Sequence, residues 1–189
     1  PVAPDYAIGP DNVLPHWVYL SIVGDVLAYS VGDSAQGSGY RLEFRVGAEG
    51  AAADEGRVEQ VIGIGSSRVG GFPDLVQVYV TASAGNTGTF TAAMALQYLD
   101  ANDAVIGSEV TDSATIAAGA SDILEAYATT AGIAPTNARS LRIRVSGKRG
   151  AAAVTASGAL QITEVRRTNR TSKQGFTADG TWTKPAGTS

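Results

Sequence analysis

The chain has 189 residues, of which 17% are charged, and its formal net charge is −4. The absence of cysteine excludes a disulfide scaffold, a zinc–cysteine site and a thiol nucleophile. The acidic balance argues against a surface that binds nucleic acid. No apolar run reaches the roughly eighteen residues of a membrane-spanning helix, so we also expect no membrane insertion.

Apolar and polar residues alternate repeatedly along the chain, as they do in β-strands with one buried face. The alternation is strict in Tyr40–Val46, Val76–Val80 and Leu141–Val145. Turn-forming residues such as Gly85-Asn86-Thr87-Gly88 separate these segments. In chain order, the predicted strands cover residues 17–23, 25–30, 40–46, 58–64, 76–80, 90–99, 104–110, 123–130, 141–145 and 159–165.

About ten short strands without intervening helices predict an all-β fold in which two antiparallel sheets pack as a sandwich. Residues 48–59 could form one helical turn, but Gly47 and Gly50 favour a loop there. Gly147 to Gly150 is interpreted as a turn. The residues expected to point into the core are Leu42, Phe44, Val78, Val80, Leu96, Leu141, Ile143, Leu160 and Ile162.

The pattern changes near the C-terminus, where the segment after Val165 is polar, basic and without periodicity. We interpret it as a linker. The predicted organisation is an N-terminal extension (1–10), one domain (11–167), a linker (168–175) and the start of a second β segment (176–189). An isolated strand pair is only marginally stable in water, so we expect Phe176 and Trp182 to dock on a neighbouring subunit or domain.

No catalytic motif is found. His16, which is the single histidine, lies between a proline and a tryptophan at the start of a strand, and no Gly-x-Ser-x-Gly turn is present. The run Asp100 to Asp103 begins like a calcium loop, but Val105 and Thr111 stand where such a loop requires glycine and glutamate. We interpret this run as a hairpin turn. Nothing selects a pair of carboxylates for glycoside hydrolysis, so we predict no enzymatic activity, no metal and no cofactor.

Aromatic residues are the remaining candidates for ligand binding, because aromatic rings stack on the apolar faces of sugars. Core packing is the competing explanation for each of them. The candidates are Trp17, Tyr19, Tyr79 and Tyr98. Strand alternation places Tyr79 opposite the face that carries Val78 and Val80, so we expect the Tyr79 ring to be exposed.

Three motifs together resemble the carbohydrate-binding-module-like, galactose-binding-like jelly rolls. They are an opening Leu14-Pro15-x-Trp17, a Gly37-to-Leu42 strand, and a hydrophobic strand followed by an Asp-rich turn at residues 96–107. The resemblance covers most of residues 10–168 and implies a jelly-roll sandwich with a glycan ligand. That family usually ends its last strand with adjacent aspartates, whereas Thr163-Glu164 stands here.

Residues 176–187, with their core Gly180-Thr181-Trp182-Thr183-Lys184-Pro185-Ala186-Gly187, resemble the start of the glycine-rich domains of bacteriophage minor tail and tail-fibre proteins. The two resemblances imply a virion structural or host-adhesion module of a phage tail or fibre. Its expected partners are other virion proteins, further copies of the chain and a host cell-surface glycan. The alternative is a non-catalytic carbohydrate-binding module of a secreted bacterial enzyme.

Overall fold

The computed structural model describes residues 17–23, 26–33, 39–46, 55–64, 71–83, 88–149 and 159–168. In the first three strands only the side chains of Val18, Glu43 and Phe44 are described. The described residues form ten strands: β1 (Trp17–Val23), β2 (Val26–Asp33), β3 (Gly39–Val46), β4 (Glu55–Gly63), β5 (Leu75–Ala82), β6 (Phe90–Leu99), β7 (Val105–Ile116), β8 (Ser121–Tyr127), β9 (Ser140–Arg149) and β10 (Ala159–Thr168).

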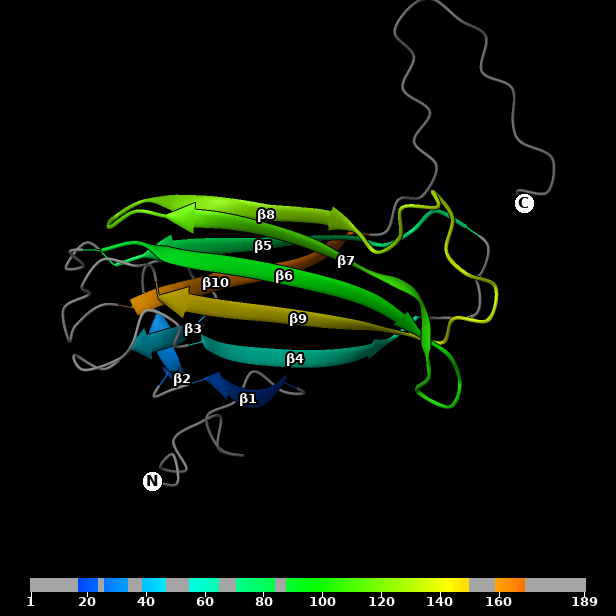
Figure 1. The fold of residues 1–189 in the computed structure, drawn as a ribbon, viewed down its shortest axis with the longest axis horizontal. Coiled ribbons are helices and arrows are strands. Elements are labelled where there is room, and N and C mark those ends of the chain that lie inside the picture. Colours follow the sequence, from blue (N-terminus) through cyan, green and yellow to red (C-terminus); the bar gives the residue numbers. More distant parts are fainter. Residues whose placement is uncertain are drawn as a thin grey trace, which may run out of the picture.

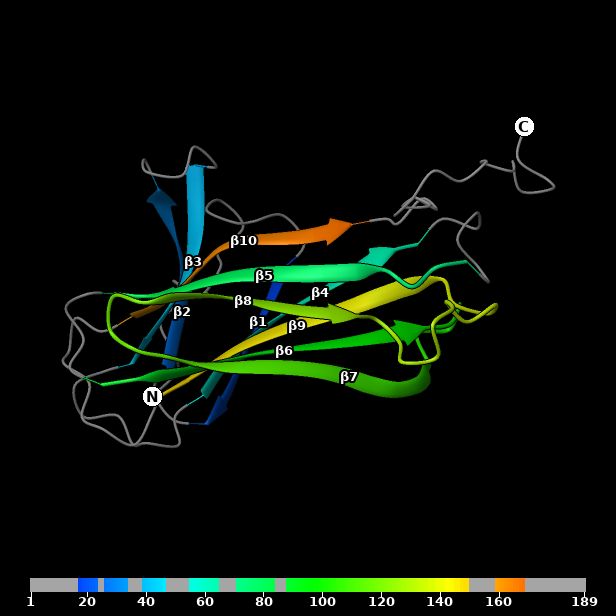
Figure 2. The ribbon, with the colours of Figure 1, turned by 90° about the horizontal axis from the view of Figure 1, so that it is seen from above.

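The strands form two five-stranded sheets that pack face to face (Figures 1 and 2). The order is β1-β4-β9-β6-β7 in the first sheet and β2-β3-β10-β5-β8 in the second. Every pair of neighbouring strands is antiparallel. The predicted all-β, two-sheet jelly-roll sandwich is therefore confirmed.

The core lies between the sheets and is built by strand alternation. In β5, for example, the side chains of Val76, Val78 and Val80 are buried and those between them are half-buried. Of the nine residues predicted to point inward, eight have described side chains, and all eight are at most 5% exposed. The ninth, Leu42, lies in β3 opposite Ile162, but its side chain is outside the described residues.

Several strands run further than predicted, among them β2, β4, β5, β7, β9 and β10. β7 continues to Ile116, because its alternation extends from Val110 to Ile116 and its pairing with β6 is kept as far as Phe90. β9 continues through Arg149, so the turn predicted at residues 147–150 is wrong for Gly147 to Arg149. β10 ends at Thr168, so the first three residues of the polar run after Val165 belong to the sheet.

Gly147 lies inside β9 because the opposite sheet leaves no room for a side chain. A Cβ atom there would lie 2.8 Å from Cδ2 and 2.9 Å from Cγ of Phe44, whose ring is fully buried. We expect Gly147→Ala to lower the free energy of unfolding by about 1–3 kcal/mol, the usual cost of overpacking a core. Urea unfolding would measure it. Gly63→Ala is the matched control, since an added Cβ in β4 meets no atom within 4 Å. Equal effects of the two substitutions would contradict the packing argument.

The run Asp100 to Asp103 forms the turn between β6 and β7, as predicted. Oδ1 of Asp100 accepts hydrogen bonds from the backbone N–H groups of Asn102 (2.8 Å) and Ala104 (2.9 Å). Asp103 adopts a positive φ of 60°, which Asp tolerates better than most residues. The aspartates therefore build the hairpin.

Candidate functional site

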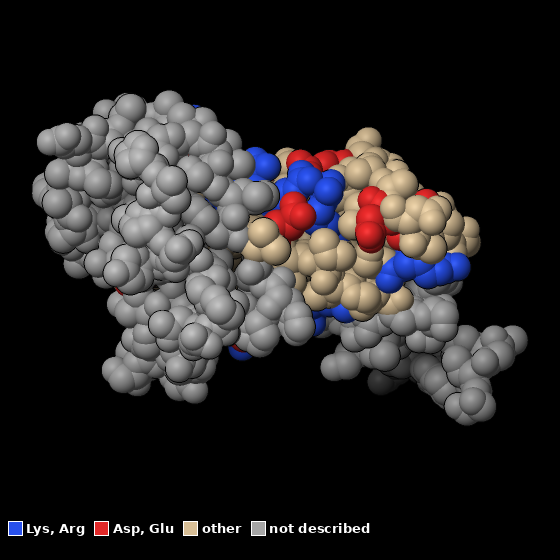
Figure 3. Space-filling view, turned by 90° about the horizontal axis from the view of Figure 1, so that it is seen from below, with Lys and Arg blue, Asp and Glu red and all other residues tan. Residues whose placement is uncertain are grey.

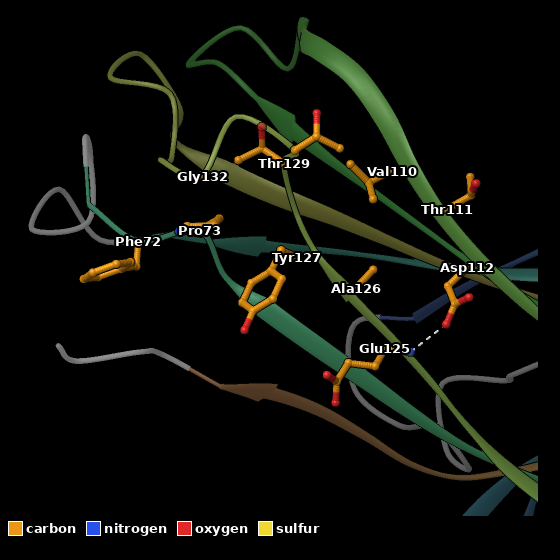
Figure 4. A pocket seen from close by; sticks show the side chains of 11 residues that line it. Phe72, Pro73, Val110, Thr111, Asp112, Glu125, Ala126, Tyr127, Thr129 and Gly132 are labelled. Carbon is orange, nitrogen blue, oxygen red and sulfur yellow. Dashed lines mark hydrogen bonds between the residues drawn. The ribbon is translucent and has the colours of Figure 1, made fainter. Parts of the chain in front are cut away.

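A cleft of about 680 Å³ lies at the edge of the sandwich, between β7 of the first sheet and β8 of the second (Figure 4). β7 and β8 are the outermost strands of their sheets and lie side by side in Figures 1 and 2. Two loops complete the walls, one before β5 and one after β8. The lining residues are Phe72, Pro73, Val110, Thr111, Asp112, Glu125, Ala126, Tyr127, Thr129, Thr130 and Gly132.

Asp112 ties the two strand edges together at the bottom of this cleft. Asp112 belongs to the inward-facing row of β7 and lies opposite Met94 of β6. From there its side chain reaches β8, the edge strand of the second sheet. Its Oδ2 accepts a hydrogen bond from the backbone N–H of Glu125 in β8 at 2.8 Å, drawn as a dashed line in Figure 4. Its Oδ1 accepts one from the backbone N–H of Ser113 at 2.9 Å. A carboxylate satisfied by two backbone donors positions the walls of the cleft.

Two aromatic rings lie at one end of the cleft. Tyr127, at the end of β8, is half-buried, and Phe72 is 58% exposed (Figure 4). Backbone hydrogen bonds hold the Phe72 loop from both sides. The N–H of Ala134 donates to the carbonyl oxygen of Gly71, and the N–H of Ala128 donates to that of Asp74, each at 2.8 Å. The exposed phenylalanine is therefore carried on an anchored loop.

A buried polar cluster fixes the base of the same loop. Asp74 is 3% exposed, and its Oδ1 accepts a hydrogen bond from Nε of Arg167 in β10 at 2.8 Å. The hydroxyl of Tyr98 in β6 donates to Oδ2 of Asp74 at 3.2 Å and accepts from the Asp74 backbone N–H at 3.0 Å. β6 of the first sheet and β10 of the second are thus joined to the loop that carries Phe72 and Pro73.

Burial raises the pKa of Tyr98 from 10.0 to about 12, because the phenolate would lose its hydration, and the negative charge of Asp74 adds to the shift. Between these values an unfolded chain releases the Tyr98 proton and the folded chain keeps it. The contribution of Tyr98 to stability is therefore complete below pH 10 and is lost as the pH rises to about 12.

We expect the difference in free energy of unfolding between the wild type and Tyr98→Phe to shrink over that range of pH. Denaturant unfolding at several pH values would measure it. A difference that stays constant up to pH 12 would contradict the shift.

The remaining polar groups of the cleft are hydroxyls and one further carboxylate. Thr111 and Thr130 contribute exposed hydroxyls, and the Thr129 hydroxyl accepts a hydrogen bond from the backbone N–H of Ala131 at 3.2 Å. Glu125 is exposed and accepts a hydrogen bond from the Gln77 side-chain amide. No Lys, Arg, His or Cys occurs among the described residues that line the cleft. Such a surface can bind hydroxyl groups and apolar ring faces.

The structure corrects the prediction for Tyr98 as a ligand-binding residue. The Tyr98 side chain is 1% exposed, because it lies in the same inward-facing row of β6 as Leu96. Its hydroxyl is held by Asp74 inside the core. No face of the Tyr98 ring is therefore available to a ligand.

Tyr79 lies on the outer face of the second sheet, opposite the buried valines, as the alternation predicts. The ring is half-buried, because the guanidinium of Arg166 lies over it, 5.4 Å from the ring centroid. Arg166 is held in turn by Glu164, with Nε 2.6 Å from Oε1. A ligand that stacked on this face of the ring would have to displace the Arg166 guanidinium.

The structure does not test the other predicted residues. Trp17 and Tyr19 lie in β1, but their side chains are outside the described residues, and their ligand role stays a prediction. His16, Phe176 and Trp182 lie outside the described residues altogether, so the docking role of Phe176 and Trp182 also stays a prediction.

Phe72 and Tyr127 were not among the predicted site residues, although each has a signal in the sequence. Phe72 stands in Gly70-Gly71-Phe72-Pro73, a turn-forming context that keeps a large apolar side chain out of any strand core. Tyr127 shares its face of β8 with Ile123 and Glu125, opposite the buried Leu124. Alternation within β8 therefore points Tyr127 outward.

A second, smaller groove of about 300 Å³ lies on the outer face of the first sheet. Arg144 lies between two carboxylates there, with Nε 2.8 Å from Oε2 of Glu59 and Nη1 2.5 Å from Oε2 of Glu109. None of the described residues that line this groove is aromatic. In Figure 3, basic and acidic side chains lie next to one another on the described part of the surface. The groove therefore holds a network of ion pairs without a stacking surface.

The described part of the chain contains no group of three or more His, Asp or Glu side chains placed to hold a metal ion. It also contains no helix with the length and apolarity needed to cross a membrane.

No family model matches the sequence, and no curated protein is similar to it. Solved structures are similar in fold. The enzymatically active domain of tailspike protein 4 from bacteriophage CBA120 matches 87% of this chain with a TM-score of 0.53 and 14% identity, and the match covers 21% of that chain. The C-terminal family 22 carbohydrate-binding module of a Clostridium thermocellum protein matches 80% of this chain and 84% of its own, at 17% identity and a TM-score of 0.46.

A xylan-binding domain from Paenibacillus barcinonensis matches 82% of this chain and 88% of its own, at 13% identity and a TM-score of 0.44. This chain thus spans about a fifth of the tailspike chain that it matches. At such identities the comparisons describe the fold alone, and the chain has the β-sandwich fold that it shares with a domain of a phage tailspike.

Proposed function

We propose that this chain is a glycan-binding module without catalytic activity, and that the cleft between β7 and β8 holds the sugar. The observation that carries the proposal is the pairing of an exposed Phe72 and a half-buried Tyr127 with hydroxyl and carboxylate groups in one cleft. Aromatic rings cover the apolar faces of sugar rings, and the polar groups accept or donate hydrogen bonds to sugar hydroxyls.

The two acidic residues of the cleft support binding without chemistry. Glycoside hydrolysis needs one carboxyl group as proton donor and a second as base or nucleophile. Both oxygens of Asp112 already accept backbone hydrogen bonds, and Glu125 accepts one from Gln77. Incubation of a bound oligosaccharide with the protein should therefore release no shorter product.

A glycan longer than the cleft would continue along the outer face of the second sheet. Tyr127, Glu125 and Ile123 share that face of β8, and Tyr79 lies opposite Ile123 in β5. Tyr127 and Ile123 are four residues apart in an extended strand, so Tyr79 lies about 14 Å from Tyr127 along the direction of the strands. In this proposal Tyr79 makes a secondary contact at the far end of the bound chain.

The proposed setting is a phage tail or fibre, in which several copies of the chain and other virion proteins surround the module. Two observations support it: the sequence of residues 176–187, and the fold shared with a domain of a phage tailspike. Mass spectrometry of purified particles should detect this chain. Its occurrence only within a secreted enzyme would contradict the virion setting and leave the glycan cleft untouched.

We expect Tyr127→Ala and Phe72→Ala each to weaken glycan binding by at least about tenfold, since each removes one of the two aromatic rings of the cleft. A glycan array would first identify a ligand, and calorimetric titration would then compare the variants. Ile133→Ala is the matched control, because Ile133 is as exposed as Phe72 (58%) and does not line the cleft. Tyr79→Ala should have a smaller effect. Unchanged affinity in both cleft variants would contradict the proposed site.

A further inference from the structure

We propose that the cleft selects glycans without acidic groups, namely neutral sugars and sugars with free amines, and that Glu125 is the residue that rejects acidic ones. The inference rests on the proposed function and adds the class of ligand to it. It follows from the charges that line the cleft and from the pairing of the cations around it.

The charge of the cleft has one sign. Asp112 and Glu125 are its two charged lining residues among those described, and both are acidic. Asp112 comes from β7 and Glu125 from β8, and both belong to the lining of the cleft. A bound carboxylate, sulfate or phosphate group would lie near these two negative charges and would lose part of its hydration, with no cation among the described lining residues to compensate.

The two arginines of β10, in the second sheet, are already paired. Arg167 points inward, with Nε 2.8 Å from Oδ1 of the buried Asp74. Arg166 points outward, where it pairs with Glu164 and lies over Tyr79. Gln77 stands between Arg166 and Glu125 in the register of β10, β5 and β8. These arginines therefore leave the negative charge of the cleft in place.

The chemistry of the two carboxylates suits hydroxyl and ammonium groups. A carboxylate accepts hydrogen bonds from sugar hydroxyls without any change of charge, and it forms a charge-assisted hydrogen bond with a protonated amine. Both oxygens of Asp112 are occupied by backbone N–H groups, whereas Glu125 is exposed and lies on the outer side of β8 next to Tyr127. Glu125 is therefore the carboxylate that a bound sugar meets first.

The test compares three oligosaccharides of similar length: N-acetylated glucosamine oligomers, the same oligomers with free amines, and glucuronate oligomers. We expect the glucuronate oligomers to bind at least about fivefold more weakly than the neutral ones, and the free amines to bind at least as well, as one uncompensated charge contact predicts. Raising the ionic strength from about 0.01 M to about 1 M, which shortens the Debye length from about 30 Å to about 3 Å, should narrow the differences.

Glu125→Gln should reduce the discrimination against glucuronate, and Glu125→Lys should reverse it. Asp122→Asn is the matched control, because it removes an exposed charge from the same strand outside the cleft and should leave the selectivity unchanged. Thermal unfolding would verify that each variant is folded.

Glucuronate oligomers that bind the wild type as tightly as neutral ones would overturn the charge selection while leaving the glycan cleft intact. A selectivity that changes neither with salt nor in the two Glu125 variants would also overturn the charge selection and leave the glycan cleft intact. If no oligosaccharide or array glycan binds, the proposed function fails, and the charge selection fails with it.

Discussion

Replacing Arg167 with Met is expected to lower the free energy of unfolding by about 3–5 kcal/mol, the usual cost of removing one partner from a buried ion pair. Asp74 is 3% exposed, and the substitution removes the guanidinium that lies 2.8 Å from its Oδ1 while the Tyr98 hydroxyl at its Oδ2 stays. Methionine retains most of the apolar stem, so the loss is confined to the guanidinium and its contacts with Asp74 and the Gly63 carbonyl oxygen. Chemical denaturation followed by circular dichroism would measure it.

Arg166→Met provides the control within the same strand. Arg166 is exposed and pairs with an exposed Glu164, and exposed ion pairs contribute little to stability. The double variant Asp74→Asn with Arg167→Met should be more stable than Arg167→Met alone, because it also removes the buried negative charge of Asp74. Equal effects of Arg166→Met and Arg167→Met would refute the buried pair.

The second large effect is expected for Ile143→Ala, which should cost about 2–5 kcal/mol, as deletions of buried side chains do. Ile143 is 1% exposed and lies in β9 between Gln60 of β4 and Leu96 of β6, at the centre of the first sheet. The truncated side chain would leave a cavity that the two packed sheets cannot close.

Arg144→Ala is the neighbouring control, because its side chain points to the opposite face of β9. Its ion pairs with Glu59 and Glu109 lie on the outer surface, where such pairs are worth about 1 kcal/mol or less. A larger loss for Arg144→Ala than for Ile143→Ala would mean that the faces of β9 had been assigned the wrong way round.

Alternation in the sequence predicts where the ten strands lie and, in several of them, which face is buried. A period of two leaves only two choices of face, and in Leu141–Val145 the arginines at 142 and 144 decide between them. The hairpin at Asp100 to Asp103 was equally predictable, because its hydrogen bonds are local. Strand ends were less predictable. Gly147 has the look of a turn residue in the sequence, and the ring of Phe44 in the other sheet, which requires a glycine at that place in β9, is visible only in the fold.

Strand order and the candidate site were decided by the tertiary structure. Nothing within β10 shows that it lies between β3 and β5, or that Arg167 will meet Asp74. Alternation with Leu96 could have placed Tyr98 in the core, but the Asp74 partner that satisfies its hydroxyl becomes visible only in the fold.

The cleft itself joins a loop at Phe72, the edge of β7 and the end of β8. These segments are distant in the sequence, and they come together only when the two sheets pack and bring their edges side by side. The charge and the aromatic surface of the cleft therefore could not be predicted from any single segment.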